Sequence, residues 1–161
     1  MKIMKNEKFI SIDPGTEKSA FAIFGNGLEL MEFGKKENSE ILEIIRKSDA
    51  EILAIEAVAS YGMPVGAEVF ETCYFIGMAM EAAFKTNKKV CKIYRKDEKL
   101  NLCGSLKAND ATIRQALIDR FGGKGTKKNP GYFYGVKGDV WQAIAVGVTF
   151  YDMKKRGELN E

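Results

Sequence analysis

The chain has 161 residues, which is the size of one ordinary domain, and we expect a single domain over residues 1–161. A hydrophobic fraction of 45% and a charged fraction of 29% exclude a largely disordered chain. No apolar run approaches the length of a membrane span, and the N-terminus lacks the apolar segment of a signal peptide. The chain has no histidine, which excludes Ser-His-Asp hydrolysis and histidine-ligated zinc chemistry. Its 3 cysteines form no CxxC pair, so we expect a reducing, cytoplasmic environment.

The first part of the chain predicts three antiparallel strands and a helix. Residues 9–13 are a short apolar run that stops at a Pro-Gly turn, and residues 19–24 form a second such run. A Gly-Asn-Gly hairpin signal follows, and residues 28–33 alternate as a third strand. Apolar residues then recur at helical spacing over residues 41–45, behind Ser39, which can cap the helix.

The rest of the chain alternates strands and helices. Residues 51–56 are apolar throughout the interior, which is typical of a parallel strand covered on both faces. Residues 64–84 predict a long helix with apolar side chains around nearly its whole circumference, which suits a central helix or a subunit interface. A fifth strand follows at residues 90–94, and two helices begin near residues 110 and 139. The order of elements predicts an α/β fold with a mixed five-stranded sheet and helices on both faces.

Positive charge is concentrated between residues 85 and 137. This segment holds 14 lysines and arginines against 4 acidic residues, whereas the remainder of the chain has a balance of −7. Such asymmetry indicates a polyanionic partner, with a solvated lysine-rich surface as the alternative. Aromatic residues lie among the basic ones and could stack on unpaired bases, which favours a nucleic acid. They are Tyr94, Phe121, Tyr132, Phe133 and Tyr134.

Three acidic residues stand where one edge of the predicted sheet could collect them. Asp13 and Glu56 each close an apolar strand, and ligands gather at the carboxyl ends of strands in open α/β sheets. Asp139 and Gln142 share one face at the start of the last helix. An oxygen-only set suits Mg²⁺ or Mn²⁺, and two such ions can cleave a phosphodiester. A turn residue, a surface charge and a helix cap are the alternative roles of the three acids.

Several segments resemble the RuvC-type Holliday junction resolvases of the ribonuclease H-like superfamily. Ile12–Gly15 resembles the first motif of that family, a strand-end Asp before Pro-Gly, and Ala54–Val58 resembles the second, a strand-end Glu. Asp139–Val146 resembles the final helix, and residues 102–121 are similar to the penultimate one. The similarity runs in order from about residue 9 to residue 152, and the short basic sequence resembles the lactococcal phage-encoded branch.

The resemblance implies a homodimer that binds four-way DNA junctions and nicks two strands with Mg²⁺ or Mn²⁺, as a phage protein in a bacterial host. It implies that Asp13, Glu56 and Asp139 hold the metal ions, that Lys99 lies near the scissile phosphate, and that the helix at residues 64–84 contributes to the dimer interface. The other side chains that we expect to contact DNA are Tyr61, Lys107, Lys124, Lys127, Lys128 and Lys137.

The sequence departs from the family pattern at two positions. Gln142 stands where the family has a second acid or a histidine, so either metal binding is weaker or Asp110 supplies the missing carboxylate. Ala59 stands where a base-stacking aromatic is expected, and Tyr61 is the nearest replacement. A branched-DNA binding module without catalysis and a broader fork or flap nuclease are therefore alternatives. Residues 13–16 also resemble the phosphate loop of actin-like ATPases, but 161 residues cannot hold the two domains that such enzymes need.

Overall fold

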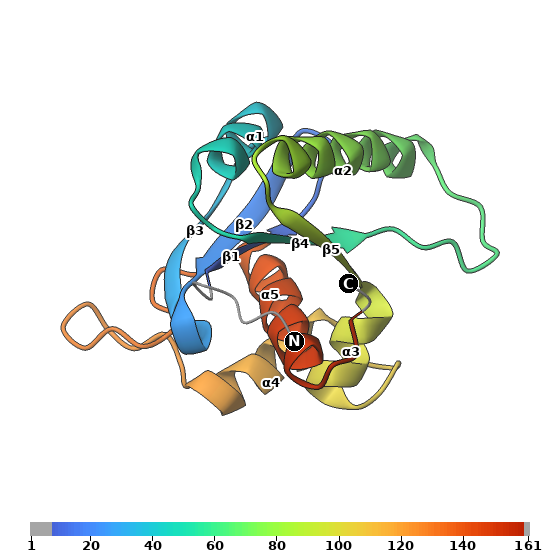
Figure 1. The fold of residues 1–161 in the computed structure, drawn as a ribbon. Coiled ribbons are helices and arrows are strands. Elements are labelled where there is room, and N and C mark those ends of the chain that lie inside the picture. Colours follow the sequence, from blue (N-terminus) through green and yellow to red (C-terminus); the bar gives the residue numbers. More distant parts are fainter. Residues whose placement is uncertain (1–7, 160–161) are drawn as a thin grey trace.

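A computed structural model describes residues 8–159 of the protein, and its centre is a five-stranded sheet (Figure 1). The strands are β1 (Phe9–Asp13), β2 (Lys18–Phe24), β3 (Leu30–Glu37), β4 (Ile52–Ala57) and β5 (Lys89–Tyr94), in the order β3-β2-β1-β4-β5. β2 pairs antiparallel with both β1 and β3, whereas β4 pairs parallel with both β1 and β5. The mixed sheet with three antiparallel opening strands is thus confirmed.

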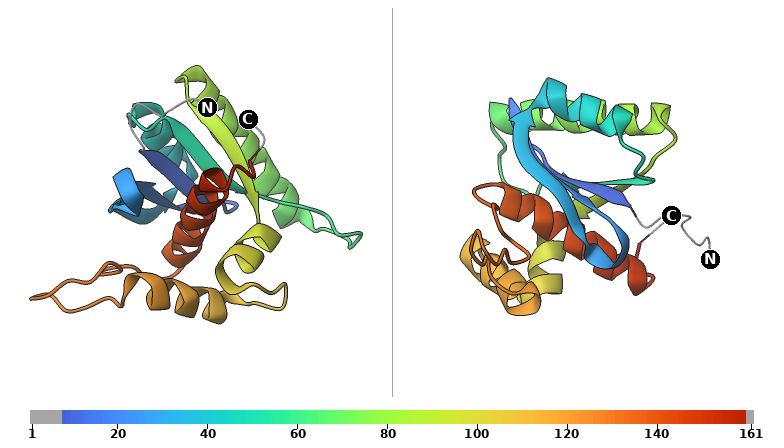
Figure 2. Two further views of the ribbon diagram at one scale, coloured as in Figure 1. Left: turned by 60° about the horizontal axis from the view of Figure 1, so that its bottom comes forward. Right: turned by 90° about the vertical axis from the view of Figure 1, so that its left-hand side faces the viewer.

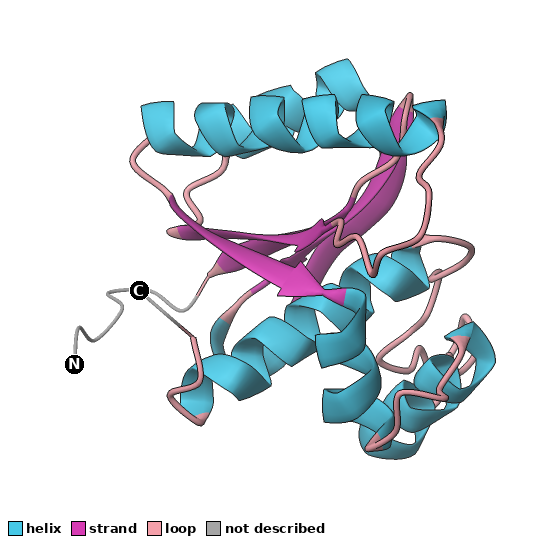
Figure 3. Ribbon diagram, turned by 90° about the vertical axis from the view of Figure 1, so that its right-hand side faces the viewer, coloured by secondary structure: helices cyan, strands magenta, loops and turns pink. Residues whose placement is uncertain are grey.

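Helices cover both faces of the sheet (Figures 1 and 3). Within residues 8–159 the α-helices are α1 (Asn38–Lys47), α2 (Ala67–Lys85), α3 (Arg95–Cys103), α4 (Asp110–Phe121) and α5 (Val140–Lys155). α1 and α2 lie on one face, and α5 crosses the other, with α3 and α4 packed beside it. None of the helices in this range is both long and apolar enough to cross a bilayer.

Two hydrophobic clusters explain why the central strands are apolar throughout. Successive side chains of a strand point to opposite faces of the sheet. Phe9 and Ala54 therefore pack into the cluster around α5, while Ile10 and Leu53 pack into the cluster beneath α1 and α2. A strand covered on both faces has no exposed side on which polar residues would be favoured.

α5 approaches the sheet closely at Gly147. A Cβ at this position would lie 2.3 Å from a ring carbon of Phe24 and 2.9 Å from Ser11 Oγ, so only glycine fits. Ser11 Oγ also donates a hydrogen bond of 2.6 Å to the carbonyl of Ala143 in the first turn of α5. These contacts fix Asp139, at the N-terminus of α5, relative to the end of β1.

Some boundaries differ from the sequence expectations. α3 was not expected, because its sequence is almost entirely polar and has no helical repeat of apolar residues. α2 begins at Ala67 rather than at residue 64, and residues 58–66 form an exposed loop apart from half-buried Ala59. β3 begins at Leu30 because residues 26–28 form a 3-10 turn, and α1 follows Glu37 instead of being capped by a serine.

Several aromatic residues of the basic segment belong to the core. Phe133 is fully buried, and the rings of Phe121 and Tyr132 stack with their centroids 4.5 Å apart. The Tyr132 hydroxyl donates a hydrogen bond of 2.7 Å to the carbonyl of Leu28. The expectation that these three residues stack on bases is wrong, because they anchor the segment to the sheet. Tyr134 is 44% exposed and remains open to such a contact.

Candidate active site

The three acids singled out in the sequence come from three elements that meet at one edge of the sheet. Asp13 is the last residue of β1, and Glu56 lies near the end of β4. The parallel register pairs Ile12 with Ile55, so the two acids follow next to each other on neighbouring strands. Asp139 immediately precedes α5, whose first turn is held on β1.

The electrostatics of Asp13 confirm that the three carboxylates are near one another. The pKa of Asp13 is raised from 3.8 to about 7, first by burial and then by the negative charges of Glu56 and Asp139. The positive charges of Arg95 and Lys35 act in the opposite direction. Charges shift a pKa only when they are nearby, so these side chains lie in one neighbourhood, which we call the cluster. The structure thus brings together the acids that the sequence predicted, along with two cations that it did not.

The turn after β1 holds Asp13 in place. The backbone N–H of Gly15 donates to Ser19 Oγ at 3.0 Å, and the Asn38 side chain donates to the Gly15 carbonyl at 3.0 Å. A Cβ on Gly15 would lie 2.3 Å from the carbonyl oxygen of Lys18, so the tight turn requires glycine. The Pro-Gly sequence therefore ends β1 sharply and leaves the Asp13 carboxyl at the sheet edge.

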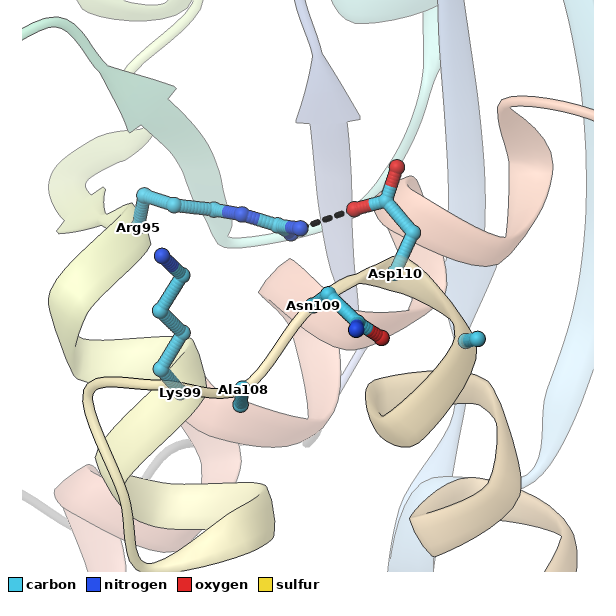
Figure 4. Close-up of a pocket in the computed structure, with 6 residues that line it drawn as sticks. Arg95, Lys99, Ala108, Asn109 and Asp110 are labelled. Carbon is cyan, nitrogen blue, oxygen red and sulfur yellow. Dashed lines mark hydrogen bonds and ion pairs between the residues drawn. The ribbon is translucent and has the colours of Figure 1, made fainter.

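Two cations are interleaved with the acids. Lys35 Nζ lies 2.5 Å from Asp139 Oδ2, and this hydrogen bond raises the pKa of Lys35. Arg95, at the start of α3, donates a hydrogen bond of 2.5 Å to Gln142 Oε1 and forms an ion pair with Asp110 (Figure 4). The Gln142 oxygen is thus engaged by an arginine, and so is the carboxylate of Asp110, which is 73% exposed.

A fourth carboxyl group, that of Glu98, was missed by the sequence reasoning. Glu98 lies in the first turn of α3 with a side chain that is 0% exposed, and its carboxyl group is within hydrogen-bonding reach of Glu56. Burial, followed by the contact with Glu56 and the charge of Glu56, raises its pKa far above the usual range. The signal that could have found it is position: α3 directly follows β5, whose carboxyl end is at the same edge as that of β4.

The donor set can be tested against a divalent cation. Within residues 8–159 no three acidic or cysteine side chains are arranged closely enough to enclose one ion, so no ready-made site is present. The chemistry nevertheless fits Mg²⁺ or Mn²⁺, because every side chain in question offers a hard oxygen. Glu56 Oε2 is also buried with no hydrogen-bond partner among the described residues, which is costly for a carboxylate in the absence of a cation.

The predicted basic residues lie on two sides of the cluster. Lys99, on α3, lines a shallow pocket with Arg95, Asn109 and Asp110, in which Arg95 and Asp110 point toward each other (Figure 4). Lys107 is exposed in the loop between α3 and α4. Lys99 is therefore close to the cluster, because it shares a pocket with Arg95. Lys107 lies outside this pocket, in the loop that follows α3.

The remaining lysines belong to the segment between α4 and α5, which we call the arm (residues 122–138). Its first part projects from the fold (Figure 2), whereas Phe133 and Val136 near its end are buried. Backbone hydrogen bonds hold the arm as a hairpin: Gly131 donates to the Lys124 carbonyl at 2.8 Å, and Thr126 donates to the Asn129 carbonyl at 2.9 Å. All four lysines of the arm are exposed; they are Lys124, Lys127, Lys128 and Lys137. Tyr61, which is 65% exposed, lies on the separate loop at residues 58–66.

The strand order and the helices on both faces define a ribonuclease H-like fold. Among solved structures, that of Thermus thermophilus RuvC matches with a TM-score of 0.73 and 17% identity, covering 95% of this chain and 98% of that one. T. thermophilus RuvC in complex with a Holliday junction substrate matches with a TM-score of 0.75 and 16% identity, over 96% and 98% of the two chains. A fowlpox virus resolvase in complex with Holliday junction DNA matches with a TM-score of 0.58 and 13% identity, and the match covers 89% of this chain and 98% of that one.

The chain therefore has the fold of RuvC over nearly its whole length. No family model matches the sequence, and no curated relative does so either. The likeness thus lies in the arrangement of helices and strands and not in the sequence.

Proposed function

We propose that the protein is a structure-selective DNA endonuclease that nicks Holliday junctions and related branched DNA by divalent-metal-dependent hydrolysis, which makes it a crossover junction endodeoxyribonuclease. The observation that carries this proposal is the cluster of Asp13, Glu56 and Asp139, in which the charges of Glu56 and Asp139 act on Asp13 at the edge of the sheet. The fold supports it, because two solved structures with this fold hold Holliday junction DNA.

Asp13, Glu56 and Asp139 are the residues that would hold Mg²⁺ or Mn²⁺. Such ions, when bound, activate a water molecule and stabilise the leaving oxygen of a phosphodiester. The chain itself orients the ligands: Lys35 holds Asp139, and Arg95 holds Gln142, so both side chains at the start of α5 face the cluster. Lys99, which lines the same pocket as Arg95, is the lysine that we assign to the phosphate that is cut.

DNA binding is assigned to the exposed basic side chains and one aromatic residue. Lysines that neutralise phosphates displace counterions, so binding should weaken steeply as salt rises. Tyr61 offers an exposed ring for stacking on a base at the branch point, since it lies on a loop that projects from the end of β4. The lysines assigned to the phosphates are Lys107, Lys124, Lys127, Lys128 and Lys137.

The apolar helix α2 supports a homodimer. One side of α2 is buried on the sheet, while Phe70, Tyr74 and Met78 form a stripe at four-residue spacing that is 52%, 63% and 56% exposed. Contiguous exposed apolar side chains are typical of interaction surfaces. A second copy of the chain would give two active sites, which is what symmetric nicking of a junction needs. Tyr74→Glu should convert the dimer to a monomer in sedimentation experiments.

The proposal is tested by cleavage of labelled four-way junctions, forks, flaps and linear duplex with Mg²⁺, with Mn²⁺ and with EDTA. Asp13→Asn and Glu56→Gln should each abolish nicking and leave junction binding intact, because they remove ligands but no phosphate contact. Asp119→Asn, on the exposed side of α4, is the matched control and should cut at the wild-type rate. Nicking in EDTA, or by either site variant at the wild-type rate, contradicts the proposal.

Two other outcomes would identify the alternatives. Equal cutting of forks, flaps and junctions would indicate a broader nuclease with the same active site. Binding of junctions without any nick would indicate a non-catalytic module, which the contact between Gln142 and Arg95 favours because an amide there neutralises no metal charge.

A further inference from the structure

Glu98 is the acidic residue of the protein whose position is hardest to explain by folding alone. Its side chain is 0% exposed, and Arg95 is 3.4 Å from one carboxyl oxygen, Oε1. The other oxygen, Oε2, is buried and has no hydrogen-bond partner among residues 8–159, and the same is true of Glu56 Oε2. Each of these two neighbouring carboxyl groups therefore has a buried oxygen with no partner other than the opposite carboxyl group.

Such a pair is unfavourable unless something compensates it. A buried carboxyl group that keeps an unsatisfied oxygen loses its hydration, and an apolar residue of similar size would avoid that loss. α3 does not need Glu98 for its own start, because Asp97 accepts the capping hydrogen bond from the backbone N–H of Tyr94 at 2.9 Å. Glu98 also lies on the sheet side of α3, since its carboxyl group reaches Glu56 on β4.

The two other candidates for a fourth ligand are held more closely by Arg95 than Glu98 is. Gln142 presents its amide oxygen to Arg95, and an amide brings no charge to a metal. Asp110 is largely exposed and pairs with the same arginine. The charges of both Glu56 and Asp13 act on Glu98, in contrast, so it belongs to the cluster itself.

We infer that Glu98 is a fourth acidic ligand of the metal centre. It binds the cation beside Glu56 and replaces the carboxylate that is missing at Gln142. This inference rests on the proposed function, because it concerns the same divalent cation. The competing explanation is structural: a neutral Glu98 only donates a hydrogen bond to Glu56. Glu98→Gln separates the two, because its amide keeps the donor but is a much weaker ligand.

The experiment measures Mn²⁺ binding to the DNA-free protein, by titration calorimetry and by electron paramagnetic resonance of free Mn²⁺. Glu98→Gln should lower the Mn²⁺ affinity at least about tenfold while the metal-free protein unfolds at the wild-type temperature or above it. Glu98→Leu fills the buried position without a polar atom and should show the same loss of Mn²⁺ affinity. It replaces the glutamine variant in this test if that variant folds poorly. Affinity within about twofold of the wild type in either variant overturns the inference.

Further variants keep this test apart from the test of the function. Glu56→Gln should lose Mn²⁺ affinity, whereas Asp119→Asn should not. If Glu56→Gln loses affinity but Glu98→Gln keeps it, Glu98 is only a hydrogen-bond donor and the proposed nuclease still stands. If no variant changes the affinity and the wild type does not cut junctions, the proposed function fails. Adding Gln142→Asp to Glu98→Gln should restore affinity, and its failure to do so would mean that Glu98 does not replace that carboxylate.

Discussion

Asp13→Asn should make the metal-free protein more stable at neutral and alkaline pH, although it removes a residue of the active site. In the folded protein the ionised Asp13 is partly desolvated and faces Glu56 and Asp139, which raises its pKa to about 7 from 3.8. The folded state therefore holds this proton more tightly than the unfolded state does. The wild type loses stability as the pH rises from about 4 to about 7, and the loss is complete above that range. Asparagine has nearly the same shape and never carries the charge.

The size of the effect follows from the two pKa values. The difference between 3.8 and about 7 corresponds to roughly 4 kcal/mol, at about 1.4 kcal/mol per tenfold change in proton affinity. Rearrangement of Glu56 and access of water reduce this figure, so we expect a gain of about 1–4 kcal/mol at pH 8 and little difference at pH 4. In a domain of this length about 1 kcal/mol shifts the melting temperature by about 2–4 °C.

The assay is thermal unfolding followed by circular dichroism, in EDTA, from pH 4 to pH 8. Asp119→Asn, the same substitution at an exposed position, should show no gain that grows with pH. Excess Mg²⁺ should raise the melting temperature of the wild type more than that of Asp13→Asn. If the two proteins melted together at pH 8, or if the gain were as large at pH 4, Asp13 would not be a buried charge held among other acids.

Two further predictions concern the scaffold and the DNA surface. Gly147→Ala should destabilise the protein by about 1–3 kcal/mol in thermal or urea unfolding, because its Cβ would lie 2.3 Å from the Phe24 ring. Gly77→Ala, in α2 with open space around it, should instead be neutral or stabilising by about 0.5–1 kcal/mol. Replacing both Lys127 and Lys128 with alanine should weaken junction binding and flatten its salt dependence by about 1–2 in the slope of log K against log salt. An unchanged slope would show that the arm does not contact phosphates.

The positions of the acids on β1 and β4 could be predicted, because the pattern of apolar residues shows where each strand ends. Each strand is apolar until it reaches the sheet edge, and parallel pairing brings equivalent ends together. Asp13 and Glu56 therefore follow from local sequence and one topological rule. Asp139 follows from a helix start, although its place beside β1 depends on the close packing of α5 at Gly147.

The rest of the cluster depends on contacts between distant parts of the chain. Lys35 and Asp139 are 104 residues apart, and nothing in the sequence near either residue indicates the ion pair. α3 escaped prediction for a related reason. It is held by Leu102 and Cys103, which pack against the cluster around α5, rather than by an apolar stripe of its own. The burial of Glu98 therefore leaves no mark in its charged local sequence, and only its position directly after β5 points to the site.

The charges of the cluster explain how the site tolerates the neutral Gln142. Asp13, Glu56, Glu98 and Asp139 can carry four negative charges, and the two cations that face them, Lys35 and Arg95, can offset only two. The site thus keeps an excess of negative charge suited to a divalent cation without any acid at position 142. An acid there would form a third ion pair with Arg95, beside those with Glu98 and Asp110, and would hold the guanidinium more firmly, whereas the amide binds it through a single neutral oxygen. Under the proposed function, glutamine at this position would leave Arg95 easier to displace by a cation and a phosphate.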